Sequence, residues 1–216
     1  MLTIENLNKR YGQTSVFANV SLTVASGEFV AIVGESGVGK STLLNCMAGL
    51  DSWDAGSIQV ADKSLGGMSA EQLALWRRSA VGFVFQAFHV LPHLDVAQNI
   101  ALPLMLLGTG KFETSERVTH MLDAVGLNGL GTRLPSELSG GQLQRVAIAR
   151  AMVHRPALVL ADEPTGNLDP STAERVMDAL IAQTRSHGAS LVLVTHSQAA
   201  AQRADRVLHL TALGCA

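Results

Sequence analysis

The residues at 34–42 combine side-chain types that together can bind a phosphate chain. They read GESGVGKST and fit the pattern G-x-x-x-x-G-K-[ST]. The glycines let the backbone curl so that successive N–H groups point at an anion. Lys40 supplies a compact charge for the β- and γ-phosphates, and the Ser41 hydroxyl is a natural Mg²⁺ ligand. A glycine-rich turn that binds nothing is the alternative. The apolar strand pattern before the loop and the helical pattern after it favour a nucleotide site.

Polar residues also follow three other runs that read as buried strands. They are Gln86, the pair Asp162 and Glu163, and His196. Ligands of open α/β sheets bind outside the carboxyl ends of the strands, so these groups converge on one phosphate if their strands are neighbours. Asp162 is then a second Mg²⁺ anchor, and Glu163 is placed to orient and deprotonate an attacking water. Helix capping and solvation would explain an Asp-Glu pair alone, but the upstream phosphate loop favours catalysis.

A second glycine-containing stretch, LSGGQ at 138–142, precedes a helical pattern. Ser139 and the two glycines expose backbone donors and a hydroxyl where that helix begins, which makes another anion cradle. A simple N-cap with a flexible lead-in explains the same residues, and the residues alone leave both interpretations open.

The elements that must position these residues alternate between strand and helix. Strands are predicted at 2–4, 16–24, 29–33, 57–60, 81–85, 157–161, 191–195 and 207–210, with a turn at 9–12. Capping boxes or caps open helices at Ser69, Asp95 and Asp169, and Pro103 is expected to interrupt or kink the second of these. The period is helical from 87 to about 153, which predicts a helical subdomain inserted into an α/β core with a mostly parallel, covered sheet.

Composition limits the functions that the chain can have. The 216 residues are 47% hydrophobic and 16% charged with a net charge of −2, which is typical of a globular domain and indicates no nucleic-acid surface. The two cysteines are far apart, so a disulfide framework is not expected. The first residues do not show the basic-then-apolar pattern expected of a signal segment, and the apolar runs are shorter than the roughly 20 residues that span a bilayer.

Six motifs in order and at matching spacing make the sequence resemble an ATP-binding-cassette (ABC) ATPase along essentially its whole length. The Walker A loop is 34–42, the Q-loop residue is Gln86, and the signature motif is 138–142. Walker B with its catalytic glutamate is 158–163, the D-loop is 167–169, and the switch histidine is His196. The stretches 85–94 and 162–169 resemble the subgroup of lipoprotein-release (LolD-type), macrolide-export (MacB-type) and related systems.

The resemblance implies a single cassette over 1–216 with a RecA-like P-loop NTPase core, an N-terminal antiparallel β subdomain and the helical subdomain at 87–153. It implies hydrolysis of ATP to ADP and phosphate with Mg²⁺. The implied catalytic residues are Glu163, His196, Gln86 and Lys40, and the metal ligands are Ser41, Gln86 and Asp162. The implied nucleotide-binding residues are Tyr11, which stacks on adenine, with Gly34, Glu35, Ser36, Gly37, Val38, Gly39, Lys40, Ser41, Thr42, Ser139, Gly140, Gly141, Gln142 and Asp169.

The resemblance also implies partners and a place in the cell. Two chains sandwich two ATP molecules, with the signature motif and Asp169 acting across the dimer, and the motion reaches separate transmembrane permease subunits. The protein is then cytoplasmic and peripheral on the inner face of the cytoplasmic membrane. Phe88, Val90 and Leu91 are expected to help line a groove for a permease helix. Two alternatives remain: a regulatory member that signals through a membrane partner, and a soluble member of DNA repair or translation.

Overall fold

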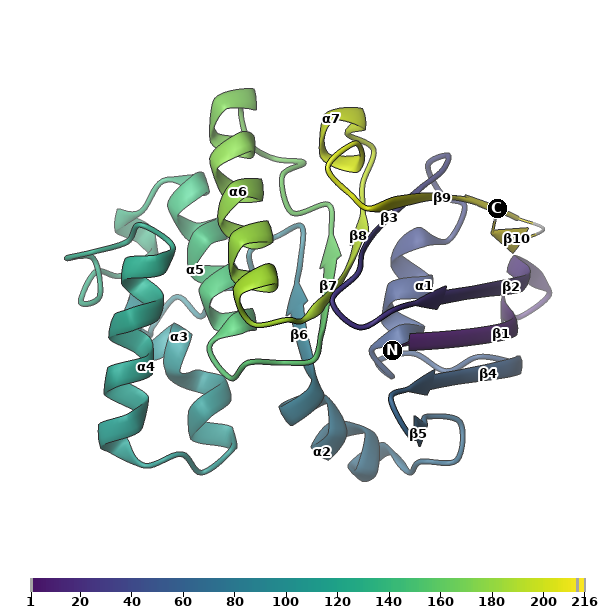
Figure 1. Ribbon diagram of the computed structural model, residues 1–216, viewed down its shortest axis with the longest axis horizontal. Helices are drawn as coiled ribbons and strands as arrows, with labels where there is room; N and C mark the ends of the chain where they lie inside the picture. The colour runs from purple at the N-terminus through teal and green to yellow at the C-terminus, as the bar shows by residue number, and fades with distance from the viewer. Residues whose placement is uncertain (1, 213, 216) are drawn as a thin grey trace.

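The computed structural model describes residues 2–212 and 214–215, and its centre is a six-stranded sheet (Figure 1). The strand order is β10-β9-β3-β8-β7-β6, in which β9, β3, β8, β7 and β6 run parallel and β10 pairs antiparallel with β9. The predicted mostly parallel sheet is therefore confirmed. Its strands are β3 Phe29–Val33, β6 Val81–Val84, β7 Leu158–Asp162, β8 Ser190–Val194, β9 Arg206–Thr211 and β10 Gly214–Cys215.

A second, antiparallel sheet of order β2-β1-β4-β5 lies at the other end of the molecule from the helical part (Figure 1). The predicted turn at 9–12 is wrong, because Lys9, Arg10 and Tyr11 complete β1 and the hairpin reverses at 12–13. Lys9 takes a buried position in that strand because its ammonium is paired with Asp51 at 2.7 Å. The strands are β1 Leu2–Tyr11, β2 Thr14–Val24, β4 Ala55–Val60 and β5 Lys63–Ser64.

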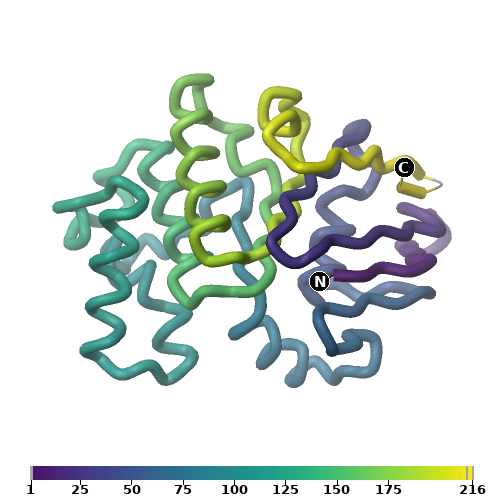
Figure 2. The backbone as a smooth tube through the Cα atoms, viewed as in Figure 1, coloured from purple at the N-terminus to yellow at the C-terminus, as the bar shows by residue number. Residues whose placement is uncertain are grey.

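The region predicted to be helical folds as three helices and a short 3-10 turn beside β6 and β7 (Figure 2). Capping boxes open α2 and α3 at Ser69 and Asp95, and Asp169 caps α6, as the sequence predicts. A capping box also opens α5 at Ser139, where the residues alone left a simple N-cap and an anion cradle open. Pro103 does not end α3, which continues to Leu106. The helices are α1 Lys40–Met47, α2 Ala70–Ala80, α3 Val96–Leu106, α4 Lys111–Ala124, η1 Pro135–Glu137, α5 Gly140–Met152, α6 Pro170–Ser186 and α7 Gln198–Ala201.

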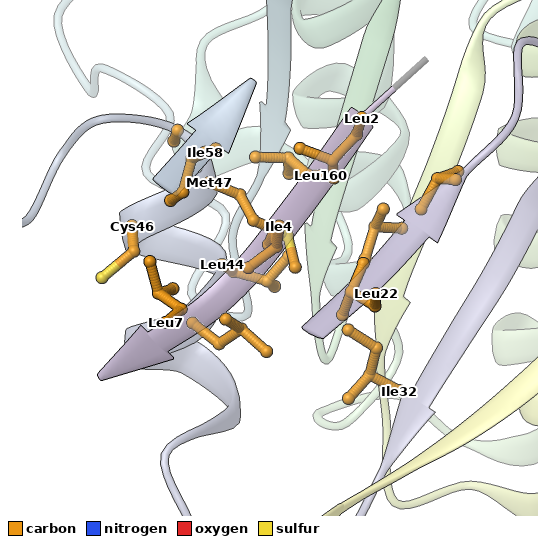
Figure 3. Packing of buried hydrophobic residues seen from close by; sticks show 14 of the residues in the cluster. Leu2, Ile4, Leu7, Leu22, Ile32, Leu44, Cys46, Met47, Ile58 and Leu160 are labelled. Carbon is orange, nitrogen blue, oxygen red and sulfur yellow. The ribbon is translucent and has the colours of Figure 1, made fainter. Parts of the chain in front are cut away.

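Two apolar clusters hold these layers together on opposite faces of the six-stranded sheet. One joins the antiparallel sheet and α1 to residues such as Ile32 and Leu160, and it buries Cys46 as the small core residue that the sequence predicts (Figure 3). The other joins α3, α4, α5 and α6 to the remaining sheet residues. Within the described residues, no helix is both long enough and apolar enough to cross a bilayer.

Candidate functional site

The strand order brings the four predicted strand ends to one edge of the sheet. β3, β8, β7 and β6 are consecutive neighbours, so the condition for convergence of their terminal residues is met. A cavity of about 680 Å³ opens there, within the range of natural ligand sites, which is roughly 300–1,000 Å³. It is lined by Tyr11, Val16, Ser36, Gly37, Gly39, Lys40, Ser41, Thr42, Gln86, Glu163, Gly166, Val194 and His196.

The phosphate loop wraps the beginning of α1, and its N-cap residue is Gly39 in the left-handed conformation at φ 100°. A side chain there would be strained, and its Cβ would lie 2.6 Å from Cγ1 of Val16. No side chain of the described residues caps this helix, so its first backbone N–H groups are left for a ligand. Lys40 is buried, and its ammonium donates to the carbonyl oxygens of Gly34 and Glu35 at 3.0 and 2.8 Å. Burial lowers the pKa of Lys40, and Glu163 and Asp162 oppose that shift.

Two oxygen donors meet where the sequence predicts a metal. The hydroxyl of Ser41 donates to Oδ1 of Asp162 across 3.0 Å. Partial burial raises the pKa of Asp162 above its ordinary value, although the hydrogen bond from Ser41 and the charge of Lys40 oppose the shift. Hydroxyl and carboxylate oxygens are the ligand type that Mg²⁺ prefers. The residues present therefore fit the ion.

Glu163 follows β7 in a strained backbone conformation, with φ at +44°. Its N–H donates to the carbonyl oxygen of Val194 at 2.9 Å, which ties the turn to β8. Thr195 donates to Oε2 at 3.3 Å, and Nε2 of His196 lies 3.4 Å from Oε1. No described residue donates a hydrogen bond to the buried Oε1 atom. A strained, mostly buried carboxylate beside a cavity, with one oxygen that accepts no hydrogen bond from a described residue, can accept a proton from a bound water.

Tyr11 stands at the end of β1 and lines the cavity with more than half of its side chain exposed. Its hydroxyl donates to Oδ2 of Asp51 at 2.5 Å, and the ammonium of Lys9 lies over the ring, 4.6 Å from its centre. The sequence analysis did not identify Asp51 or Thr195. Thr195 could have been found as the neighbour of His196 at a strand end, whereas no sequence signal connects Asp51 with Tyr11.

The signature residues are not part of this cavity. Ser139 caps α5, and its capping box with Gln142 joins Ser139 N to Oε1 at 2.8 Å and Gln142 N to Oγ at 3.4 Å. Gly141 lies so close to α6 that a Cβ would be 2.2 Å from Cγ2 of Thr172. The motif is thus a second helix N-terminus on the surface of the helical part.

The remaining predicted residues lie around these two places. Gly34 and Glu35 line an adjoining cavity that shares His196, and Val38 packs against the first apolar cluster. Asp169 caps α6 by accepting from Ser171 Oγ at 2.8 Å and from Thr172 N at 3.1 Å. Hydrogen bonds from these two residues lower the pKa of Asp169 to about 2.

Comparisons with known proteins agree with this geometry. A family model described as ABC transporter matches residues 17–166. The lipoprotein-releasing system ATP-binding protein LolD of Xanthomonas axonopodis pv. citri (strain 306) is 44% identical and aligns with 97% of this chain and 88% of its own length. The uncharacterized ABC transporter ATP-binding protein YbbA of Escherichia coli (strain K12) is 42% identical over 97% of this chain and 94% of its own length.

A solved structure is similar over nearly the whole chain. It is the dimeric, post-hydrolysis state of the ATP-binding cassette MJ0796 bound to ADP and Pi, which matches with a TM-score of 0.90 and 35% identity. The alignment covers 99% of this chain and 96% of that one. A second structure, titled as the dimeric structure of the same cassette, matches equally well at 36% identity.

Proposed function

The chain belongs to the ABC transporter family as an ATP-binding, ATP-hydrolysing subunit, and on that premise we propose how it works. Two copies close around two ATP molecules, hydrolysis reopens the pair, and the motion drives separate transmembrane subunits. The protein is then a peripheral subunit on the inner, cytoplasmic face of a membrane. The names of its relatives favour a lipoprotein-releasing type of complex.

One observation supports the proposal that two chains form a dimer. The cavity holds the phosphate loop, Glu163 and His196, whereas residues 139–142 lie outside it on a separate surface. A helix N-terminus with glycines is suited to an anion. Each chain therefore offers two half-sites, and the solved relatives are dimers. Two chains placed head to tail complete both sites, with Asp169 close to the same interface.

The side chains divide the chemistry between them. Lys40 and the N–H groups of the loop bind the β- and γ-phosphates, and the Tyr11 ring receives the base. Glu163 accepts a proton from the attacking water through Oε1, and His196 orients that water and the γ-phosphate. Thr195 holds the other oxygen of Glu163, so the carboxylate cannot rotate away.

Ser41, Asp162 and Gln86 would hold Mg²⁺ in this site. The ion supplies neutralisation of the phosphate charge that builds up during phosphoryl transfer. Gln86 lies just beyond β6, and its carbonyl oxygen accepts from Nδ2 of Asn167 at 3.4 Å, which connects this ligand to the segment before Asp169.

The surface that receives a membrane partner lies beside α3. Of the three groove residues expected from the sequence, Leu91 alone is exposed, since Phe88 and Val90 are partly buried. A groove of about 280 Å³ lies between β6, α2, α3 and α5. Apolar side chains such as Phe83, Leu102 and Leu106 line it together with Arg77, Arg78, Arg150 and His154. Met105 and Leu106 are each 64% exposed, and a helix of the partner can bury them.

Copurification tests this function directly. Leu106→Asp should leave ATP hydrolysis by the isolated chain unchanged but lose the membrane protein that copurifies with the wild-type chain from detergent extracts. Leu75→Asp, at an exposed apolar position of α2 outside the groove lining, is the matched control and should retain it. Retention by both variants would contradict docking at the groove. A partner whose reconstituted complex hydrolyses ATP without moving or releasing a lipid-anchored substrate would favour signalling instead.

A further inference from the structure

A three-residue network fixes the aromatic side chain at the base end of the cavity. Lys9 donates to Oδ1 of Asp51 at 2.7 Å and to the carbonyl oxygen of Ser52 at 2.6 Å. Tyr11 donates to the other carboxylate oxygen of Asp51 at 2.5 Å. The Lys9 ammonium also lies over the Tyr11 ring. Asp51 therefore uses both oxygens to hold two neighbouring side chains of β1.

The protonation states of Asp51 and Tyr11 support the hydrogen bond between them. Partial burial raises the pKa of Asp51, but the hydrogen bonds from Lys9 and Tyr11 outweigh that effect and lower the pKa below its usual range. The hydrogen bond to Asp51, with partial burial, raises the pKa of Tyr11. At neutral pH Asp51 is thus a carboxylate and Tyr11 a protonated phenol, which is the arrangement that a charge-assisted hydrogen bond requires.

The network also connects the two ends of the nucleotide site. Asp51 lies in the loop that follows α1, where its N–H and that of Leu50 donate to the carbonyl oxygen of Asn45 at 3.3 and 2.8 Å. The other end of α1 begins at Lys40 in the phosphate loop. The ring of Tyr11 is consequently tied to the same rigid helix that presents the phosphate donors, although Tyr11 itself belongs to the antiparallel sheet.

The hairpin backbone alone does not orient that ring. Tyr11 pairs with Thr14 directly beside the reversal at 12–13, at the end of the ladder, and its side chain is 55% exposed. An exposed aromatic side chain at a strand end samples several rotamers unless a partner selects one, and ordering it on binding weakens affinity. The hydroxyl is the only polar atom of the side chain, and it is bonded to Asp51.

We propose that Asp51 is a positioning residue for the nucleotide: it holds the Tyr11 ring in the orientation that receives the base, at a constant distance from the phosphate loop. This inference depends on the proposed binding of nucleotide in the cavity. Part of the affinity of the site for the base of the nucleotide then depends on the carboxylate of Asp51, which does not itself line the cavity.

Titrations with ADP and with inorganic pyrophosphate distinguish contacts to the base from contacts to the phosphates, and neither ligand is turned over during a titration. Calorimetry would compare wild type, Tyr11→Phe, Asp51→Asn and the double variant. Tyr11→Phe keeps the ring and the Lys9–Asp51 ion pair but removes the tether. We expect the Kd for ADP to rise about three- to tenfold in each single variant, which is the size of an ordinary hydrogen bond's net contribution. The Kd for pyrophosphate should stay constant, and the double variant should be no weaker than the worse single one.

Asp178→Asn is the matched control, since it removes the ion pair with Arg203 on the surface of α6 and should change neither Kd. A structural role for the network would lower the melting temperature and weaken ADP and pyrophosphate in parallel, which would overturn the proposal. An unchanged Kd for ADP in Tyr11→Phe would also overturn it. A wild-type chain that binds neither ligand would overturn the proposed function and this inference together.

Discussion

Two helix N-termini in this molecule carry the glycine-containing motifs at 34–42 and 138–142, yet the two ends are capped differently. Helix α1 begins after Gly39, has no side-chain cap, and opens into the cavity. Helix α5 begins after Ser139, which closes a capping box with Gln142, and lies outside the cavity. The first end has backbone N–H groups without a side-chain acceptor and a buried ammonium beside them. At the second end, the hydroxyl of Ser139 accepts a hydrogen bond from one of the first N–H groups of the helix.

The difference indicates which N-terminus can act alone. Unsatisfied N–H groups next to Lys40 are suited to bind an anion without a second chain. In the proposed function, the capped end of α5 meets only the anion that a partner chain brings. The glycines of the two motifs also have different structural reasons. Gly39 is required by its left-handed backbone conformation, whereas Gly141 is required by its close contact with α6. The following predictions test whether the first end serves the chain's own nucleotide and the second serves a partner's.

The largest effect is expected at the general base of the cavity. Glu163→Gln preserves size and hydrogen bonding but cannot accept the proton of the attacking water. Turnover should fall by roughly 10²–10⁴-fold, the usual contribution of general-base catalysis, while ATP still binds. A pair that closes on ATP then has no means to reopen, so size-exclusion chromatography with Mg-ATP should show a dimer. A strictly monomeric variant with wild-type turnover would contradict both the base and the dimer.

A smaller but selective loss is expected at the capped N-terminus. Ser139→Arg puts a long side chain where the partner's γ-phosphate would bind and leaves the chain's own phosphate loop intact. Hydrolysis should fall by about 10²-fold, comparable to loss of a donor to a developing charge, and the remainder should be non-cooperative. The Kd for ATP should not change. Normal steady-state hydrolysis by this variant would show that α5 does not serve a nucleotide.

The opposite pattern is expected at the uncapped N-terminus. Lys40→Ala removes a charged contact to the phosphates that forms before any chemistry. Affinity for ATP should fall roughly 10- to 100-fold, as for loss of one or two charge-assisted hydrogen bonds. Equilibrium binding measures this directly. If the Kd for ATP is unchanged, the buried ammonium is structural and the distinction between the two N-termini fails.

The smallest effect is expected from adding a methyl group to the glycines of α5. Gly141→Ala places Cβ 2.2 Å from Cγ2 of Thr172, whose hydroxyl accepts from Arg175. We expect a loss of about 1 kcal/mol in the free energy of unfolding, since the contact must open by more than helix propensity returns. Gly140→Ala is the control, because its nearest neighbour, Cδ2 of Leu168, is at an ordinary 3.6 Å. Equal stabilities in urea titrations would show that the α5–α6 contact does not require glycine.

The sequence predicts the local parts of both N-termini because they depend on residues three or four positions apart. The capping boxes of α2, α3 and α5 and the cap of α6 are all readable in this way. The turn predicted at 9–12 fails because a charged Lys9 inside an amphipathic strand reads as a loop residue. Its partner Asp51 is 42 positions away, beyond the reach of any local pattern.

The sequence by itself determined the chemistry: a phosphate loop, two possible acid–base groups, and a second helix that opens with two glycines. These follow from residue type and short spacing, which set hydrogen bonds and backbone conformation locally. Only the tertiary structure decided that β3, β8, β7 and β6 are neighbours, so that Lys40, Glu163 and His196 share one cavity and Ser139 does not. It also decided that Asp51 holds Tyr11. The layers stack so as to bury their apolar faces, and the apolar pattern of a sequence says little about which distant polar residues then meet.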